Sequence, residues 1–221
     1  MSDYSVKEIL SQTDERIAAG AMGDYSLTEK DMRVALALFR QFRPETVLDF
    51  GVNEGHTADF LLKHCPWIKL WVGVDLLPEK FPERGIVPKV AGRLATGDPR
   101  FCSLLTDETI GDFQVKVAKL IAGQPGRPAA AGFFDCVIID ANHEDWATKR
   151  DTEGTAPYLR KGGLWLWHDY NVESRQNPNA RVFGVKGYLD GLIAAGRQIK
   201  TPDEADRDPW TCCSLAWEMN I

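Results

Sequence analysis

Four side chains that can move protons or hold cations stand directly after two apolar runs of the sequence. Asp140 and His143 follow the first run, and His168 and Asp169 follow the second. Carboxylates and imidazoles are the groups that proteins use for acid–base catalysis and for binding divalent cations. Their placement therefore predicts a reactive crevice at the ends of two buried strands.

A loop with two glycines forms a second candidate site, at Gly51 and Gly55, directly after the apolar run 46–50. Glycine lets the backbone approach a ligand closely, and a helix that starts after the loop offers free N–H groups. A plain tight turn between a strand and a helix would use the same glycines. The dinucleotide fingerprint needs further glycines where this sequence has Asn53 and His56, which argues against a pyrophosphate cofactor.

Three acids favour a cofactor that contains adenosine. Asp49 stands at the exit of the strand before the glycine loop, close to where a positively charged group of the cofactor would lie. Asp75 ends the next apolar run, and an acid there can accept both ribose hydroxyls. Asp98 follows segment 86–97, a weakly patterned third strand, and could face the adenine. An ordinary turn aspartate would fit the position of Asp98 equally well.

Alternating strands and helices must position these residues. Apolar runs predict strands at 46–50, 70–74, 86–97, 133–139, 164–167 and 211–219. Helical spacing predicts helices at 57–64, 101–121, 144–159 and 181–195. The alternation predicts an α/β, Rossmann-like fold, in which a doubly wound and mostly parallel sheet is covered on both faces. Ligands of such sheets bind beyond the carboxyl ends of the strands, where most of the candidate residues stand.

Two more helices are predicted before the first strand. One spans 5–19, and the other begins where Ser26 and Glu29 have the spacing of a capping box. Because both precede the alternating part of the chain, they form an N-terminal addition. We therefore divide the chain into N-terminal helices at 1–44 and a Rossmann-like domain at 45–221.

Composition narrows the class of protein. The 221 residues are 44% apolar and 26% charged, as in an ordinary globular protein. The net charge of −6 argues against a nucleic-acid partner, since an acidic surface repels phosphate backbones. No apolar stretch is long enough for a membrane span, and five cysteines without a CxxC pair fit neither a disulfide framework nor a zinc site. These features predict a cytoplasmic protein whose partner is a small molecule, and they leave a homo-oligomer open.

The glycine loop and its acids resemble known motifs. The segment Val-Leu-Asp-Phe-Gly-Val-Asn-Glu-Gly at 47–55 is similar to motif I of class I, Rossmann-like methyltransferases that use S-adenosylmethionine (SAM), and Asp75 matches their motif II acid. The resemblance implies a SAM site formed by six residues. They are Asp49, Gly51, Asn53, Gly55, Asp75 and Asp98.

The second half of the chain resembles a bacterial family that includes O-methyltransferases acting on sugars of antibiotics and glycolipids. The shared pattern is Ile-Asp-x-x-His, a helix bearing an acid (here Asp151), and Gly-Gly before a strand that ends in His-Asp-Tyr. The sequence departs from the family at Ala141, where glycine is usual, and at Asp145, where an aromatic residue is frequent. His168 replaces one acid of the metal-binding relatives.

The resemblance implies O-methylation of a hydroxyl on a small molecule or sugar. The enzyme must align the acceptor with the methyl group of SAM and remove the proton of the hydroxyl. Asp140 and His143 are the candidate catalytic residues. A divalent cation such as Mg²⁺, held by Asp140, His168 and Asp169, would be the other way to activate the hydroxyl. The sequence leaves both routes open.

Two alternatives use the same architecture. One is an NAD(P)-linked oxidoreductase, against which Asn53 and His56 argue. The other is a non-catalytic protein that binds SAM or another adenosine ligand. Since one fold hosts many functions, only the site residues can separate these possibilities. The acids and histidines that converge on one crevice favour the methyltransferase.

Overall fold

The structure is a computed structural model, and it describes residues 27–77, 91–107, 109–123, 132–170, 184–201 and 214–220. The helices are α2 (Glu29–Phe42), α3 (His56–His64), α4 (Ile110–Ala122), α5 (Asp145–Thr155) and α6 (Gly184–Ala194), with a 3₁₀ turn at Ala156–Tyr158. The strands are β1 (Thr46–Phe50), β2 (Leu70–Leu76), β3 (Phe101–Thr106), β4 (Phe134–Ile139), β5 (Leu159–Trp167) and β6 (Ala216–Met219). The helix predicted at 5–19 lies outside the described residues. None of the helices in the described ranges is long and apolar enough to cross a membrane.

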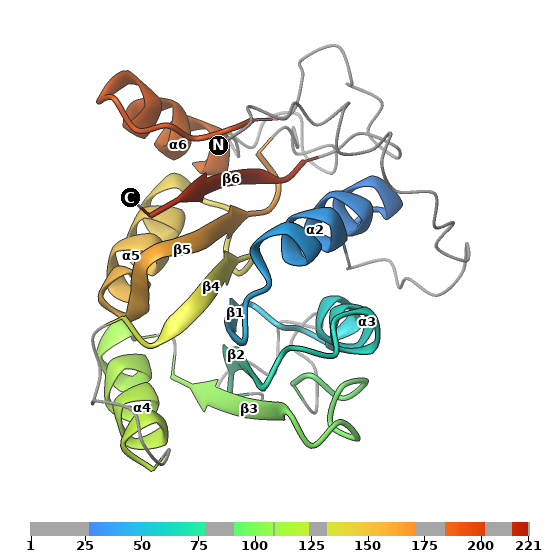
Figure 1. The fold of residues 1–221 in the computed structure, drawn as a ribbon. Coiled ribbons are helices and arrows are strands. Elements are labelled where there is room, and N and C mark those ends of the chain that lie inside the picture. The colour runs from blue at the N-terminus through green and yellow to red at the C-terminus, as the bar shows by residue number, and fades with distance from the viewer. Residues whose placement is uncertain are drawn as a thin grey trace.

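Within the described residues, six strands form one sheet in the order β3-β2-β1-β4-β5-β6 (Figure 1). The first five strands are parallel, and β6 runs antiparallel to β5. The order reverses between β1 and β4, which are neighbours in the sheet although β2 and β3 separate them in the chain. Such a reversal opens a crevice at the carboxyl ends of the strands. The predicted Rossmann-like fold is confirmed.

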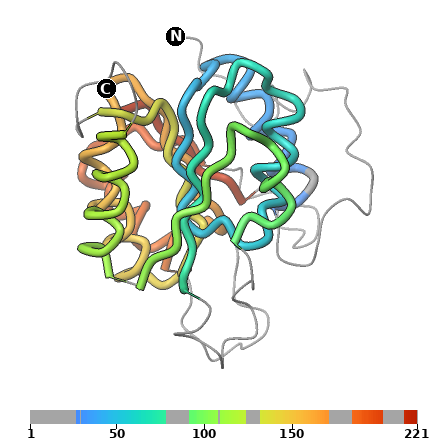
Figure 2. Tube along the Cα trace, turned by 90° about the horizontal axis from the view of Figure 1, so that it is seen from below, coloured from blue at the N-terminus to red at the C-terminus, as the bar shows by residue number. Residues whose placement is uncertain are grey.

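Helices cover both faces of the sheet. Figure 2 shows α2 and α3 on one side of the strands and α4 and α5 on the other. The alternation of side chains along each strand explains the two layers, because neighbouring residues point to opposite faces. In β1, Val47 belongs to the core under α2 and α3, whereas Leu48 and Phe50 belong to the core that includes side chains of α4 and α6.

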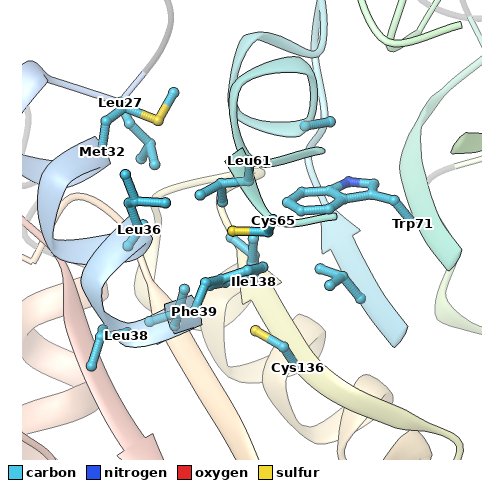
Figure 3. Close-up of a cluster of buried hydrophobic side chains, with 14 of the residues drawn as sticks. Leu27, Met32, Leu36, Leu38, Phe39, Leu61, Cys65, Trp71, Cys136 and Ile138 are labelled. Carbon is cyan, nitrogen blue, oxygen red and sulfur yellow. The ribbon is translucent and has the colours of Figure 1, made fainter. Parts of the chain in front are cut away.

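Helix α2 shares its core with the sheet. Figure 3 shows Met32, Leu36 and Phe39 of α2 near Leu61 of α3 and Trp71 of β2. All five side chains are buried, and the rings of Phe39 and Trp71 are 6.0 Å apart. Burial of large apolar side chains stabilises a fold by about 1.5–3 kcal/mol for each side chain. The described part of the N-terminal addition is therefore packed onto the sheet as one of its two covering layers.

The third strand is not where the sequence placed it. Residues 91–97 form turns, the rest of segment 86–97 lies outside the described residues, and the strand is Phe101–Thr106. The helix predicted at 101–121 therefore begins only at Ile110, after the N-cap Thr109. The reason is that β3 lies at the edge of the sheet and is mostly half-buried. An edge strand needs no continuous apolar run, so its pattern is weak.

The capping box of α2 is shifted by two residues from its predicted place. The N-cap is Thr28, and the partner at the third helical position is Asp31, not Glu29. The Thr28 hydroxyl accepts from the Asp31 N–H, and Asp31 Oδ2 accepts from the Thr28 N–H at 3.2 Å. Both Ser26 with Glu29 and Thr28 with Asp31 have the spacing of a capping box. The acid used in the structure is Asp31, which also contacts His168 and Ser214.

Candidate functional site

Backbone packing explains the two glycines of the loop between β1 and α3. Both have positive φ, 105° at Gly51 and 86° at Gly55. A Cβ atom on Gly51 would lie 2.2 Å from the carbonyl oxygen of Asp140, and one on Gly55 would lie 2.8 Å from the Cα of Gly92. The glycines therefore let the loop lie directly against the end of β4 and against the turns at 91–97.

Replacing Gly51 by alanine is expected to destabilise the protein by at least about 2 kcal/mol, because the new Cβ overlaps backbone atoms at a φ that alanine rarely adopts. Thermal or denaturant unfolding measures the effect. Gly191 is the matched control, since a Cβ there meets nothing within 4 Å and Gly191 lies inside α6. Gly191→Ala should stabilise by about 0.5–1 kcal/mol. Equal stability of Gly51→Ala and the wild type would contradict the loop geometry.

The glycine loop borders a recess at the crevice between β1 and β4. The recess is lined by Asp49, residues 51–57 and Asp140. Backbone hydrogen bonds hold this arrangement, since Asp140 N donates to Phe50 O at 2.9 Å. The predicted cofactor loop and the predicted catalytic acid Asp140 thus share one concavity.

Asp75 holds the loop from β2. Its Oδ2 accepts from the backbone N–H of Asn53 at 2.7 Å, and its Oδ1 accepts from the N–H of Leu76. Burial raises the pKa of the Asp75 carboxyl, although these two hydrogen bonds oppose the shift. Asp75 lies one residue before the end of its strand and beside the loop, as an acid that recognises a ribose would.

Asp49 is a buried acid beneath the recess. It is 3% exposed, and the indole N–H of Trp71 donates to its Oδ2 at 3.2 Å. Burial, together with the charges of Asp140 and Asp75, raises the pKa of Asp49 to about 8. A carboxyl group in this environment gains from any positive charge that enters the recess, because a cation favours its ionised form.

Asp98 lies at the wrong end of the sheet for the predicted contact with adenine. It precedes β3, so it stands at the amino ends of the parallel strands. Its carboxylate accepts from Arg100, from Nε at 2.8 Å and from Nη2 at 2.5 Å. The expectation failed because the third strand was placed before Asp98. The acid that follows β3 is Asp107, and its Oδ1 accepts from the N–H and hydroxyl of Thr109.

The four acid–base residues after β4 and β5 meet in one cluster. His168 Nδ1 lies 2.9 Å from Asp140 Oδ1 and 3.4 Å from Asp169 Oδ1. His143 Nδ1 lies 2.7 Å from Asp169 Oδ2, and His143 Nε2 lies 3.5 Å from Asp140 Oδ1. Asp169 has a left-handed backbone with φ 61°, a conformation that costs energy and is concentrated at functional sites.

A fifth member of the cluster, Asp31 of α2, was not expected from the sequence. Its Oδ2 lies 3.3 Å from His168 Nε2, so His168 stands between two carboxylates. Asp31 has no exposed surface. The only local signal was the spacing of Thr28 and Asp31, which predicts a helix cap and nothing about His168.

The charges of the cluster alternate. Burial opposes ionisation of His168, but Asp140, Asp169 and Asp31 together raise its pKa well above the ordinary value. Burial likewise opposes the charge of His143, and its contacts with Asp140 and Asp169 outweigh burial and raise its pKa to about 10. The pKa of Asp169 is lowered in return, against the effect of burial, by the two histidines.

Three members of the cluster have the composition of a divalent-cation site. One ligand atom from each of Asp140, His143 and Asp169 lies within 4.8 Å of the others. Two carboxylates and an imidazole suit hard or borderline divalent cations. The predicted ligand His168 is not a member of this group, and its two ring nitrogens contact Asp140 and Asp31.

Comparison with known proteins gives a family and a fold. The chain matches a family described as "Methyltransferase domain" over residues 48–170. No curated protein matches it. Among solved structures it resembles the O-methyltransferase TomG from Streptomyces achromogenes, involved in tomaymycin synthesis and bound to SAM, with 18% identity, a TM-score of 0.57 and coverage of 97% of this chain and 90% of TomG.

Two further structures are similar. The O-methyltransferase from Bacillus cereus, in complex with SAH, has 14% identity and a TM-score of 0.56, over 100% of this chain and 92% of that one. The MycE methyltransferase of the mycinamycin biosynthetic pathway, in complex with Mg and SAH, has 20% identity and a TM-score of 0.51, over 82% of this chain and 47% of MycE. At these identities the structural likeness establishes the fold.

Proposed function

The chain belongs to the methyltransferase-domain family and is a SAM-dependent methyltransferase, and we propose that it methylates a hydroxyl group of a small molecule or sugar. One observation carries the proposal. Asp140 lines the recess beside the glycine loop and is also a member of the cluster with His143 and Asp169. A methyl donor in the recess and an acceptor at the cluster would therefore lie side by side, as methyl transfer requires.

The recess has the features of a SAM site. We assign Asp49, Gly51, Asn53, Gly55 and Asp75 to it and leave out Asp98. SAM carries positive charge at its methionyl end, and this charge would favour the ionised form of the buried acid Asp49, which lines the recess. Asp75 supplies a carboxylate for the ribose hydroxyls. The solved relatives TomG and MycE bind SAM and SAH, which supports the same donor here.

Replacing Asp75 by alanine is expected to weaken SAM binding by about 10–100-fold, because hydrogen bonds to a charged group are worth about 1.5–3 kcal/mol. Calorimetric titration with SAM measures the change. The matched control is Asp98→Ala, which removes an acid of the same type that is paired with Arg100 at the other end of the sheet. It should leave the affinity for SAM within about twofold. A weakened affinity in Asp98→Ala alone would overturn the assignment.

The cluster can activate a hydroxyl acceptor. A hydroxyl group is a poor acid, so its proton must be removed as the methyl group is transferred. Asp140 and Asp169 provide negative charge, which raises the pKa of His143 to about 10, so His143 must lose its proton before it can bind a cation or act as a base. We propose that Asp140, His143 and Asp169 hold a divalent cation such as Mg²⁺, in place of the set with His168. A cation bound there would lower the pKa of the acceptor hydroxyl and orient it.

A transfer assay tests the function. Purified protein with methyl-labelled SAM is offered sugars and catechols, together with amines and thiols of similar size, in Mg²⁺ and in EDTA. Transfer to a hydroxyl acceptor that falls in EDTA and returns with Mg²⁺ is the expected result. Transfer in EDTA at the full rate would favour His143 as the base without a metal. SAM binding with transfer to none of the acceptors would support the alternative of a non-catalytic binding protein.

A further inference from the structure

We propose that Asp31 of α2 is a positioning residue, which holds His168 against Asp140 and thereby fixes the carboxylate of Asp140. The inference deepens the proposed function, on which it rests, because Asp140 is assigned there to the acceptor site. It gives the N-terminal addition a role in that site, although Asp31 lies outside the residues 48–170 that match the methyltransferase family.

Asp31 is a rigid anchor. Its Oδ1 accepts from the backbone N–H of Ser214 at 2.6 Å and of Leu215 at 3.1 Å. Its Oδ2 accepts from the hydroxyls of Thr28 at 2.7 Å and Ser214 at 3.1 Å. Since Asp31 is fully buried and bonded through both oxygens, its carboxylate has one orientation. Buried hydrogen-bond networks that are fully satisfied are rigid.

The anchor fixes the ring of His168 from the side opposite Asp140. A carboxylate only accepts hydrogen bonds, so the ring must donate an N–H to each acid, from Nε2 to Asp31 and from Nδ1 to Asp140. A ring bonded at both nitrogens cannot rotate without breaking one bond. His168 is also buried, so its Nε2 has no bulk water to replace Asp31.

The contacts that begin at Asp31 continue through His168 and Asp140 to His143. Asp140 Oδ1 is shared between His168 Nδ1 and His143 Nε2. A movement of His168 therefore changes the position or charge of the oxygen that His143 faces. Partners that orient a ligand or catalytic group from behind typically contribute 10–100-fold to affinity or activity. We infer that Asp31 acts on His143 only through His168 and Asp140.

Helix capping is the competing explanation for Asp31. A cap requires only its bonds with Thr28, and it predicts that Asp31 affects stability without affecting His143. The contacts with Ser214, Leu215 and His168 exceed what a cap needs. The two explanations therefore differ in what happens at His143, which faces Asp140 and Asp169.

Nuclear magnetic resonance of the full chain, labelled with ¹⁵N at histidine, distinguishes a positioning role of Asp31 from a helix cap. The chain has four histidines, His56, His64, His143 and His168, so the ring signals can be assigned by single substitutions. Asp31→Asn keeps the shape of the side chain but turns an NH₂ group or an uncharged oxygen toward His168. The expected result is a shift of the ring signals of both His168 and His143, with His56 and His64 unchanged.

Two variants serve as controls. Asp135→Asn weakens hydrogen bonds at the amino end of the sheet, away from Asp31, so it should lower thermal stability and leave the His143 signal in place. Ser214→Ala removes one hydroxyl bond to Asp31, and it should give the same pattern as Asp31→Asn with smaller shifts. It provides the test if Asp31→Asn does not fold.

The outcomes are distinct from those of the proposed function, since the spectra are recorded without SAM, acceptor or metal. Joint shifts of His168 and His143 support the inference even if no methyl acceptor is found. A His143 signal that stays in place in the folded Asp31 variant, or in Ser214→Ala, overturns it and leaves Asp31 as a helix cap.

Discussion

Replacing Asp140 by asparagine is expected to lower the rate of methyl transfer by about 10³-fold, within the range that positioned acid–base groups contribute. The reason is that Asp140 belongs to both halves of the site. It lines the recess beside the glycine loop, and its Oδ1 faces His143 and His168. Asparagine keeps the shape of the side chain and removes the charge. The measurement is transfer of the labelled methyl group at saturating SAM, with SAM affinity determined separately.

Asp135 provides the control, because it lies near the amino end of β4, whereas Asp140 directly follows the carboxyl end of the same strand. Its Oδ2 accepts from the N–H groups of Glu45 and Thr46, and Arg160 donates to its Oδ1. Asp135→Asn should therefore lower stability and leave the transfer rate of the folded protein within about twofold of the wild type. If the two variants lose the same fraction of activity, Asp140 has no special part in the reaction.

Replacing His143 by glutamine should lower methyl transfer by about 10²–10⁴-fold, whether His143 is a base or a metal ligand. His143 is the most accessible member of the cluster, with a side chain that is 42% exposed, so an acceptor can reach it. The two roles are separated by titrating the variant with Mg²⁺. If His143 is a ligand, the variant needs about 10–100-fold more Mg²⁺ and recovers activity at high concentration. If His143 is the base, excess Mg²⁺ restores nothing.

The stability of the same variant should depend on pH in a defined direction. The pKa of His143 is about 10 in the folded protein, against 6.5 for an ordinary histidine. A raised pKa contributes stability that is fully present below about pH 6.5 and is lost as the pH rises toward 10. The His143→Gln variant should therefore be less stable than the wild type near pH 6 and approach it near pH 10.5. Parallel stability curves over this range would contradict the raised pKa.

The sequence by itself determined the architecture and much of the site. Apolar runs and glycine turns are local signals, and in a parallel sheet every strand delivers its last residues to the same edge. That geometry is enough to predict that Asp49, Asp75, Asp140 and the residues after β5 meet at one crevice. The same reasoning failed for Asp98, because an edge strand such as β3 is only half-buried and leaves a weak pattern.

Only the tertiary structure decided which partner each of these residues takes. His168 and Asp31 are 137 positions apart in the sequence. They meet because α2 packs on the sheet beside Ser214, which lies just before β6. No local periodicity encodes such a contact, since it depends on how two apolar faces fit together. The packing places both ring nitrogens of His168 between carboxylates and leaves His143 with Asp140 and Asp169. The sequence thus predicts which residues form the site, whereas long-range packing determines which of them contact one another and which role each can take.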